Sequence, residues 1–341
     1  MHAIEITRPG GPEVLALIES VAPEPKMNEV LIQVFAAGVN RPDLSQRAGK
    51  YPVPADADPR PGLEVSGRVV GLGSDVQGLS IGDNVMTLTH GGGYAEYCVA
   101  LASHVLPIPQ GYSFEEAAGV PEVTMTVEYN LLMRAGLRAG EIALVHGGSS
   151  GVGSFAIDRC RSVGATVYAT AGSDLKCQFS EERGALRCFN YRADDWVAGI
   201  LRATDDIGVN VVLDMVAGSY VQRNLNVLAD DGRYALISLQ GGRMVEVDLD
   251  PLLRRRISVS GSTMRPLSNE MKGTITSKIA RDVLPLMNDG TLKRPHIDRV
   301  FALEDAAEAH RLMEHGTHLG KIVLVTKALA KHGLSVADQS L

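Results

Sequence analysis

The chain has 341 residues, of which 33 are basic and 40 acidic, so its formal net charge is -7. That length favours two domains, and a composition that is 45% hydrophobic and 21% charged is typical of a globular protein. The acidic balance provides no broad positive field, so neither nucleic acid nor an anionic membrane is expected as a partner.

The four cysteines form neither a C-x-x-C pair nor a zinc-knuckle spacing. We therefore expect neither a disulfide framework nor a structural metal. The N-terminal run carries Glu5 among apolar residues and does not resemble a signal peptide. A cytoplasmic protein is expected.

From the start to about residue 120, short β-rich runs such as 30–34 and 66–70 alternate with Gly, Pro and Asp turns. This pattern is typical of a β-barrel-like module with little helix. From about residue 122 the pattern changes, and it predicts a helix over 124–135 followed by a strand over 142–145.

Strands then alternate with helical stretches, which predicts an α/β fold with a parallel sheet covered on both faces. The further strands are expected at 165–169, 209–214 and 232–237. A strand at 299–301, a helix at 304–314 and a last strand at 321–325 are expected to rejoin the first domain. The predicted domains are 1–121 with 292–326, and 122–291, followed by a loosely held tail over 327–341.

A glycine-rich pattern, Gly151-Val152-Gly153-Ser154-Phe155-Ala156, follows the strand at 142–145 and precedes a helix predicted over 154–163. A dinucleotide's pyrophosphate needs backbone amides at a helix N-terminus and glycines that let it approach. In this context the pattern predicts a Rossmann unit, and a turn that binds nothing is the alternative. The predicted phosphate loop comprises His146, Gly147, Gly148, Ser149, Ser150, Gly151, Val152 and Gly153. For the His146 side chain itself, a structural role is the favoured interpretation.

The end of the second predicted strand selects the coenzyme. An NAD site normally carries an Asp or Glu there, hydrogen-bonded to the ribose. Here the strand continues into the uncharged residues Thr170-Ala171-Gly172-Ser173, with Lys176 about one helical turn later. We predict NADPH, with Ser173 donating a hydrogen bond and Lys176 supplying charge. Asp174 is the alternative, because a small shift of the strand end would make it a ribose ligand.

Together these motifs resemble the zinc-free quinone oxidoreductases, the zeta-crystallin-like branch of the medium-chain dehydrogenase/reductase superfamily, most closely the stress-induced quinone reductase subgroup. The resemblance runs from Met1 to about Val325. Besides the phosphate loop, the matching segments in chain order are 37–44 (AGVNRPDL), 61–67 (PGLEVSG), 82–85 (GDNV), 91–97 (GGGYAEY) and 320–324 (GKIVL).

The resemblance implies a GroES-like β-barrel catalytic domain, a Rossmann domain and a homodimer. It places Asn40, Asp43 and Tyr51 on the substrate side and Thr126 near the nicotinamide. Ser173, Lys176 and Tyr191 match the family's 2′-phosphate pocket. The other implied cofactor contacts are Gly218, Leu239, Gln240, Gly241, Met264, Arg265 and Lys321.

Zinc-dependent members of the superfamily need a Cys at the position of Asn40 and a His directly after Gly62. This chain carries Asn40 and Leu63 there, and a leucine side chain cannot ligate a metal. No metal is therefore expected.

The resemblance implies NADPH-dependent reduction of quinones or small α,β-unsaturated carbonyls, an activity of EC 1.6.5 type. The Asn40 amide or the Tyr51 hydroxyl could stabilise the anion that forms, with Asp43 as an orienting group. Plain turn chemistry is the alternative for Asn40 and Asp43. Two other functions stay open: an enoyl thioester reductase of the same superfamily, and a non-catalytic NADPH-binding sensor or structural protein. An exposed edge strand at 257–260 could pair two copies.

Overall fold

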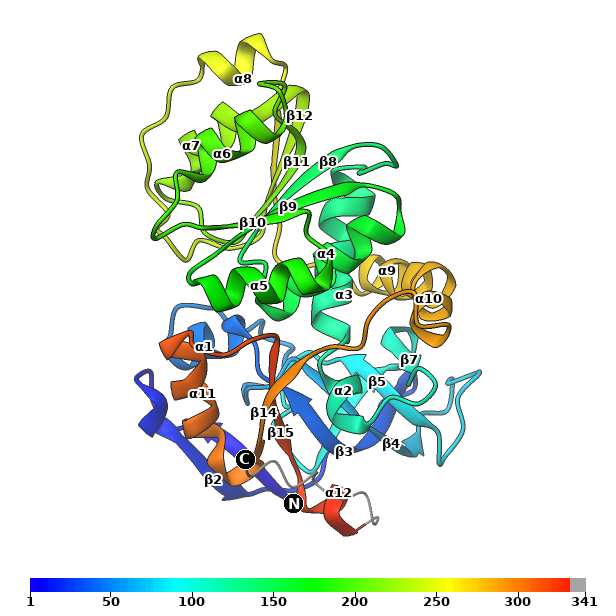
Figure 1. Cartoon of the computed structure of the whole chain (residues 1–341). Coiled ribbons are helices and arrows are strands. Elements are labelled where there is room, and N and C mark those ends of the chain that lie inside the picture. Colours follow the sequence, from blue (N-terminus) through cyan, green and yellow to red (C-terminus); the bar gives the residue numbers. More distant parts are fainter. Residues whose placement is uncertain (332–341) are drawn as a thin grey trace. The chain divides into compact units, whose positions relative to one another are not determined.

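The computed structural model describes residues 1–331, which form two compact units (Figure 1). Among the described residues, unit 1 consists of Met1–Glu122, Ser268–Asn288 and residues 294–331, and unit 2 of Val123–Leu267 and Asp289–Lys293. The α/β fold with a parallel sheet in one unit and an antiparallel β-rich unit beside it in sequence confirms the predicted fold class.

Unit 1 is built on a seven-stranded sheet in the order β14-β15-β3-β4-β5-β7, with β6 also paired to β3. The strands are β3 (Glu29–Gly38), β4 (Glu64–Leu72), β5 (Asn84–Leu88), β6 (Tyr97–Leu101), β7 (Val105–Pro107), β14 (Ile297–Ala302) and β15 (Lys321–Val325). A separate antiparallel pair is formed by β1 (His2–Ile6) and β2 (Leu15–Glu19). Since β15 pairs antiparallel with β3, the C-terminal segment does rejoin the first unit, as predicted.

Apolar side chains alternate along the first part of β3, so Val30, Ile32 and Val34 reach the core of unit 1 while Leu31 and Gln33 are only partly buried. The helices of this unit are α1 (Arg41–Arg47), α2 (Phe114–Ala118), α9 (Asn269–Asp282), α10 (Leu284–Asn288), α11 (Ala306–His315) and α12 (Lys327–Lys331), with 3-10 turns at Pro12–Val14, Ala102–His104 and Leu303–Asp305. The short helices α1 and α2 lie in the region for which the sequence pattern gave little helix.

Two assignments at the domain boundaries differ from the prediction. The segment Ser268–Asn288 groups with unit 1, because α9 packs on the 3-10 turn 102–104 and His104 Nε2 lies 3.0 Å from the Asn269 carbonyl oxygen. The predicted tail begins with α12, whose Leu329 is buried against Phe35 and so is held by the core. The rest of that tail lies outside the described residues.

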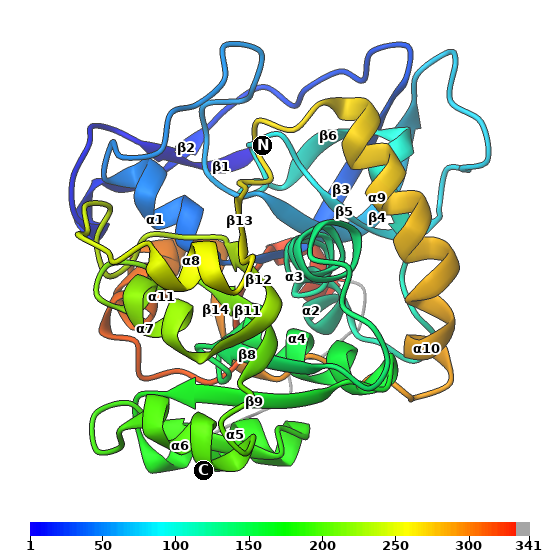
Figure 2. The same ribbon diagram turned by 90° about the horizontal axis from the view of Figure 1, so that it is seen from above.

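Unit 2 contains a six-stranded parallel sheet in the order β10-β9-β8-β11-β12-β13, which is the strand order of a dinucleotide-binding Rossmann fold. Figure 2 labels the strands of this order from β9 to β13. The strands are β8 (Ile142–His146), β9 (Thr166–Ala171), β10 (Arg187–Asn190), β11 (Val209–Asp214), β12 (Leu228–Leu236) and β13 (Ser258–Gly261). The inner strands are buried runs of Val, Leu and Ala, as expected when helices cover both faces.

The helices of unit 2 are α4 (Gly151–Ser162), α5 (Asp174–Arg183), α6 (Trp196–Ala203), α7 (Tyr220–Val227) and α8 (Asp250–Arg254). The helix predicted over 124–135 is present as α3 (Pro121–Val127), which continues as a π-helical stretch over Glu128–Arg134. Helix α4 begins three residues earlier than predicted, at Gly151, because Ser150 caps it.

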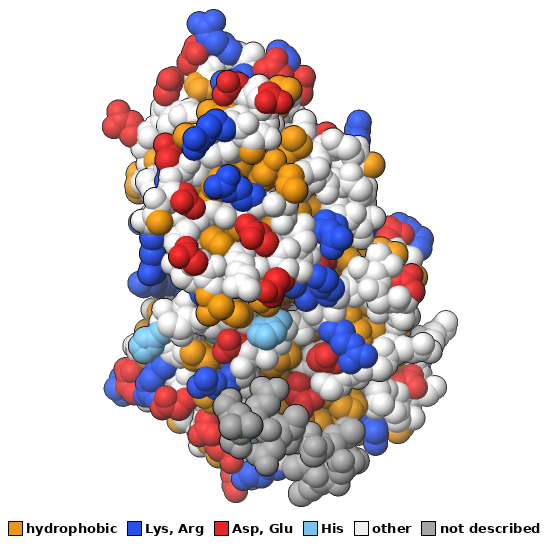
Figure 3. All heavy atoms as spheres, viewed as in Figure 1, with side chains coloured by type: hydrophobic (Ala, Val, Ile, Leu, Met, Phe, Trp, Pro, Cys, Tyr) orange, Lys and Arg blue, Asp and Glu red, His pale blue; other side chains and the backbone are white. Residues whose placement is uncertain are grey.

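Within residues 1–331 no helix combines the length and the apolar character that crossing a membrane requires. On the face drawn in Figure 3, basic and acidic side chains are interspersed.

Candidate active site

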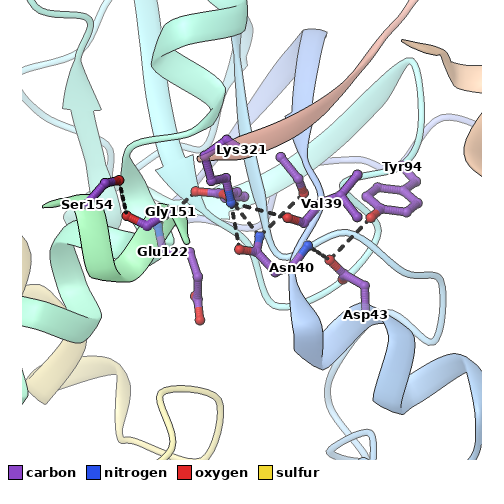
Figure 4. Close-up of polar contacts among 10 residues, drawn as sticks. Val39, Asn40, Asp43, Tyr94, Glu122, Gly151, Ser154 and Lys321 are labelled. Atoms are coloured by element: carbon purple, nitrogen blue, oxygen red, sulfur yellow. Dashed lines mark hydrogen bonds and ion pairs between the residues drawn. The ribbon is translucent and has the colours of Figure 1, made fainter. Parts of the chain in front are cut away.

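A buried polar centre in unit 1 joins Asn40, Glu64 and Lys321. Lys321 Nζ donates to Glu64 Oε1 at 2.6 Å, to Asn40 Oδ1 at 2.7 Å and to the Val39 carbonyl at 3.3 Å. Asn40 Nδ2 donates to the same Glu64 oxygen at 2.8 Å. Figure 4 shows the ammonium group lying against the amide. The three side chains therefore form one closed hydrogen-bonded cluster.

The register of two strands explains why residues so far apart in sequence meet. Val323 on β15 pairs with Gly38 on β3, and each step along one strand matches a step back along the other. Two residues further, Lys321 comes opposite Asn40, and the Val39 N–H bonds the Ile322 carbonyl at 2.9 Å. Glu64 is the first residue of β4, the strand on the other side of β3.

Asp43 fixes the turn beside this centre. Its Oδ2 accepts the Asn40 N–H at 2.8 Å, as an acid three residues into a helix commonly does, and its Oδ1 accepts the Gly62 N–H at 3.1 Å. The turn chemistry that was the alternative interpretation is thus present, and the Gly62 bond also ties α1 to the loop before β4. Burial raises the pKa of Asp43 to about 6, although both backbone bonds oppose that shift.

A row of hydrogen-bonded side chains leads from Arg47 to Asp43. Arg47 Nη1 lies 3.2 Å from His310 Nδ1, and arginine only donates, so the His310 proton is on Nε2. Nε2 lies 3.2 Å from Tyr94 Oη, which donates to Asp43 Oδ2 at 3.2 Å. Burial lowers the pKa of His310 to about 3, which agrees with a neutral ring.

Glu122, the second residue of α3, adds a carboxyl group to this region. Its backbone N–H donates to Glu64 Oε2 at 2.9 Å. Glu64 thus receives hydrogen bonds from Lys321, from Asn40 and from the start of α3. Burial, together with the nearby Glu64 carboxylate, raises the pKa of Glu122 to about 8.

In unit 2 the predicted phosphate loop lies at the carboxyl end of β8 and leads into α4. Ser150 caps the helix, since its Oγ accepts the Gly153 N–H at 3.0 Å and donates to the Gly147 carbonyl at 2.8 Å. A Cβ on Gly153 would overlap that same carbonyl oxygen, so only glycine fits. The N–H groups of Gly151 and Val152 belong to the first helical turn, where no intrahelical acceptor exists, which suits an anionic ligand.

A second buried network lies beneath this loop and joins three strands. Asn224 Nδ2 donates to Asp214 Oδ2 at 3.1 Å, so its Oδ1, 2.7 Å from His146 Nε2, accepts a hydrogen bond from the N–H of that ring. His146 Nδ1 then accepts from Thr170 Oγ1 at 2.9 Å. Burial lowers the pKa of His146, and both ring nitrogens have protein partners. The side chain of His146 therefore holds the loop, as the favoured interpretation of the sequence has it.

Strand β9 ends at Ala171, two residues beyond the predicted end, and still carries no acid at its terminus. Ser173 caps α5, and Lys176 lies in the first turn of that helix. The Tyr191 hydroxyl lies beside Gly172, since a Cβ there would be 2.5 Å from it. Asp174, the alternative ribose ligand, accepts a hydrogen bond from Asn190 Nδ2 at 2.8 Å. The three predicted 2′-phosphate residues thus gather at the ends of β9 and β10.

Other predicted cofactor residues meet at the same edge of the sheet. A Cβ on Gly218 would overlap the Gly241 carbonyl, so the loops after β11 and β12 are in contact. Gln240 N bonds the Met215 carbonyl at 3.4 Å, and Leu239 is exposed. Gly148 N donates to the Thr170 carbonyl at 3.0 Å, which links the phosphate loop to β9. Ser149 is buried within that loop.

The remaining predicted residues lie on other segments of the chain. Tyr51 follows α1 in an irregular segment, Thr126 is buried in α3, and Met264 and Arg265 are buried after β13. Their roles stay predictions. Lys321, predicted as a cofactor contact, directs Nζ at three acceptors of unit 1, and its cofactor role also stays a prediction.

The sequence analysis did not single out Glu64, Tyr94, His310 or Glu122. Glu64 and Tyr94 lie inside segments that carry the family resemblance, which is the signal that could have found them. His310 and Glu122 lie in ordinary helical contexts, and nothing local marks them. Among the described residues, no three His, Cys, Asp or Glu side chains are arranged to hold a metal ion.

The chain matches known proteins along almost its whole length. Residues 26–110 match the alcohol dehydrogenase GroES-like domain, and residues 183–324 match the zinc-binding dehydrogenase family. A quinone oxidoreductase of Sus scrofa is 34% identical over 328 residues, which cover 95% of this chain and 98% of that protein.

Solved structures agree with these sequence matches. The Escherichia coli quinone oxidoreductase complexed with NADPH has a TM-score of 0.85 at 28% identity, covering 95% of this chain and all of that one (100%). An NAD-dependent alcohol dehydrogenase reaches 0.83 at 30% identity, with coverages of 95% and 99%. The CurK enoyl reductase reaches 0.84 at 26% identity, with coverages of 95% and 99%. The chain therefore belongs to the zeta-crystallin-like quinone oxidoreductase family of the medium-chain dehydrogenase/reductase superfamily.

Proposed function

We propose that this enzyme uses NADPH to reduce quinones or small α,β-unsaturated carbonyls. The observation that carries the proposal is the full-length similarity to quinone oxidoreductases. When bound, the nicotinamide supplies the hydride, and the protein supplies binding, orientation and support for the developing negative charge.

The residues of unit 2 fit a dinucleotide phosphate. The glycine contacts at Gly148 and Gly153 leave no room for side chains, so backbone amides form the loop surface at the start of α4. The end of β9 offers the Ser173 hydroxyl and the Lys176 ammonium group instead of an acid, which favours a 2′-phosphate over a free ribose. Tyr191 completes this proposed pocket.

On the substrate side, the contacts within unit 1 modify the roles of two predicted residues. The Asn40 amide donates to Glu64 and, at 3.4 Å, to the Gly38 carbonyl, so we assign it to holding the polar centre instead of the reduced acceptor. Asp43, with both oxygens bonded to backbone N–H groups, keeps its orienting role. The Tyr51 hydroxyl remains the proposed donor to the substrate.

One experiment tests the acceptor. Steady-state oxidation of NADPH is measured with ortho- and para-quinones, small enals and enones, and enoyl thioesters. We expect turnover with the quinones or enones. Turnover with enoyl thioesters alone would support the second candidate, which the likeness to an enoyl reductase structure favours. Flat traces with every acceptor would leave a non-catalytic NADPH-binding protein.

A second experiment tests the coenzyme, because one similar structure is that of an NAD-dependent enzyme. A charged hydrogen bond contributes about 1.5–3 kcal/mol, so Lys176→Ala should weaken NADPH binding about 10- to 100-fold and leave NADH binding nearly unchanged. Lys26→Ala, at an exposed lysine of unit 1, is the control. An affinity for NADH equal to that for NADPH in the wild type would contradict the NADPH assignment.

We also propose a homodimer, on the basis of strand β13. This strand is at the edge of the six-stranded sheet, close to the predicted range, and its Val259 is half exposed. Pairing with the same strand of a second copy would cover that edge. A monomeric mass in solution would contradict this proposal. The cytoplasmic location remains a prediction.

A further inference from the structure

Reduction of the acceptor by hydride requires a proton as well, and none of the residues assigned under the proposed function supplies it. The hydride brings two electrons and one proton to the acceptor, which becomes an enolate or a hydroquinone anion. A second proton must reach this anion before neutral product can leave. A side-chain acid can supply it, provided that it is protonated at working pH and lies on the substrate side.

Three carboxyl groups lie close together in unit 1, and their surroundings differ sharply. Glu64 accepts from Lys321, Asn40 and the start of α3, and Asp43 accepts from two backbone N–H groups and Tyr94. Hydrogen bonds from donors stabilise the ionised form of a carboxyl group. Both groups are therefore fully engaged by protein donors.

Glu122 has no such support. Its backbone N–H donates to Glu64, but within residues 1–331 no side-chain or backbone donor reaches its half-buried carboxyl group. In Figure 4 the side chain of Glu122 points away from the bonded cluster, and no dashed line ends on its carboxyl oxygens. A carboxyl group that is partly desolvated beside another carboxylate retains its proton.

The charged groups around Glu122 come from four elements. Glu64 on β4 and Asp43 on α1 favour the protonated form, while Lys321 on β15 and Lys272 on α9 oppose it. Lys321 is already paired with Glu64 at 2.6 Å, and this pairing weakens its electrostatic stabilisation of an ionised Glu122. Burial is the largest influence, and the resulting pKa of about 8 leaves the group mostly protonated at pH 7.

The position of Glu122 along the chain suits the same role. It is the second residue of α3 and precedes Thr126 by four residues, which places the two side chains on one face of that helix. Thr126 is the residue predicted to lie near the nicotinamide. Glu122 also belongs to unit 1, with Asn40 and Asp43.

We propose that the Glu122 carboxyl group is the general acid that protonates the reduced acceptor. The Glu122 O–H bond breaks as a C–H bond forms at the enolate α-carbon, or as an O–H bond forms on the hydroquinone anion. Glu122 is left as a carboxylate and regains its proton from solvent. This inference rests on the proposed function, because it requires an acceptor that becomes an anion.

The first test needs neither cofactor nor acceptor. The side-chain carboxyl carbons of glutamate are labelled with carbon-13 in the full chain, and Glu122 is assigned by its loss in Glu122→Gln. We expect this group to titrate near pH 8, and at lower pH in Glu64→Gln, where the neighbouring negative charge is gone. Titration close to the ordinary value for glutamate would overturn the inference.

The second test uses turnover with the best acceptor of the panel. General acid catalysis contributes about 10²- to 10⁴-fold, so Glu122→Gln should lower kcat by about that factor while the Kd for NADPH, measured by fluorescence, stays unchanged. Glu122→Asp should recover part of the loss. The wild-type kcat should fall as pH rises through about 8, where the acid ionises, and this descending limb should vanish in Glu122→Gln.

Glu115→Gln, at another half-buried glutamate of unit 1, is the matched control and should keep the wild-type kcat. An unchanged kcat and an unchanged descending limb in Glu122→Gln would overturn the inference and leave the proposed function intact. If no acceptor oxidises NADPH, the proposed function fails, and the carbon-13 titration still decides whether Glu122 is protonated.

Discussion

Lys321 Nζ lies 2.6 Å from Glu64 Oε1, and both side chains are almost completely buried. The Asn40 amide bonds both partners, so loss of either charged side chain also removes a hydrogen bond of Asn40. In zinc-dependent members of the superfamily the position of Asn40 belongs to a metal ligand. Here an ammonium group with three acceptors lies against that position.

Breaking this pair should be costly. Removing one partner of a buried ion pair leaves an uncompensated charge and typically costs about 3–5 kcal/mol. We expect Lys321→Met and Glu64→Gln each to lower the free energy of unfolding by about that much, measured with urea. The double variant removes both charges and should be clearly more stable than the sum of the two losses predicts.

The control for this cycle is the exposed pair Arg254–Asp250, whose loss in Arg254→Met should cost less than about 1 kcal/mol. Strictly additive losses in the double variant would contradict the coupling of Lys321 and Glu64.

Adding one methyl group at Gly153 should weaken coenzyme binding. A Cβ there would overlap the Gly147 carbonyl, so the phosphate loop must shift in Gly153→Ala. We expect at least about tenfold weaker NADPH binding, since displaced amides lose charge-assisted bonds of about 1.5–3 kcal/mol each. Calorimetric titration measures this change.

Gly273→Ala is the matched control, because it adds the same methyl group to another helix with its nearest neighbour 3.6 Å away. There we expect unchanged coenzyme affinity and a gain of about 0.5–1 kcal/mol in stability. Equal NADPH affinities in the two variants would argue against a phosphate contact at the loop.

His310 should make the fold sensitive to acid. Burial lowers its pKa from 6.5 to about 3, so between these values the unfolded chain binds a proton that the folded chain does not. Stability from this group is therefore lost as pH falls from 6.5 towards 3. The advantage of wild type over His310→Gln in urea unfolding should shrink from pH 7 to pH 4.

Asp43 changes the stability in the opposite direction. Its raised pKa makes the folded state bind the extra proton between pH 3.8 and about pH 6, so its contribution to stability falls as pH rises through that range. The difference in stability between wild type and His310→Gln isolates the contribution of His310, because Asp43 is retained in both proteins. His315→Gln, at an exposed histidine of the same helix, should leave the pH dependence unchanged. An equal change in that control would remove the special role of His310.

Glu122 should make the stability of the folded state depend on pH in a higher range. Its pKa is raised from 4.5 to about 8, so the folded state binds more protons than the unfolded state in that window. Stability therefore falls as pH rises from 4.5 to 8. Glu122→Gln cannot ionise and should gain on the wild type over this range, whereas Glu115→Gln should not. Parallel curves for wild type and Glu122→Gln would contradict a protonated Glu122.

Features that depend on short stretches of chain could be predicted from the order of the amino acids alone. The phosphate loop could be predicted because a strand, its glycines and a capping serine are consecutive, and the structure places all of them at the start of α4. The uncharged end of β9 was also readable, with an error of two residues in the boundary. The family resemblance then supplied roles for residues such as Asn40 and Asp43, whose chemistry no local pattern fixes.

The surroundings of those residues depend on contacts between distant parts of the chain. The pairing of β15 with β3 brings Lys321 to Asn40 across 281 positions of sequence, and β4 brings Glu64 to the same point. Burial and hydrogen bonding then differentiate Glu64, Asp43 and Glu122, three carboxyl groups that are equivalent in the sequence. Packing against the turn at 102–104 likewise moves α9 from its predicted domain. Long-range pairing sets these environments, and a carboxyl group's environment determines whether it keeps its proton.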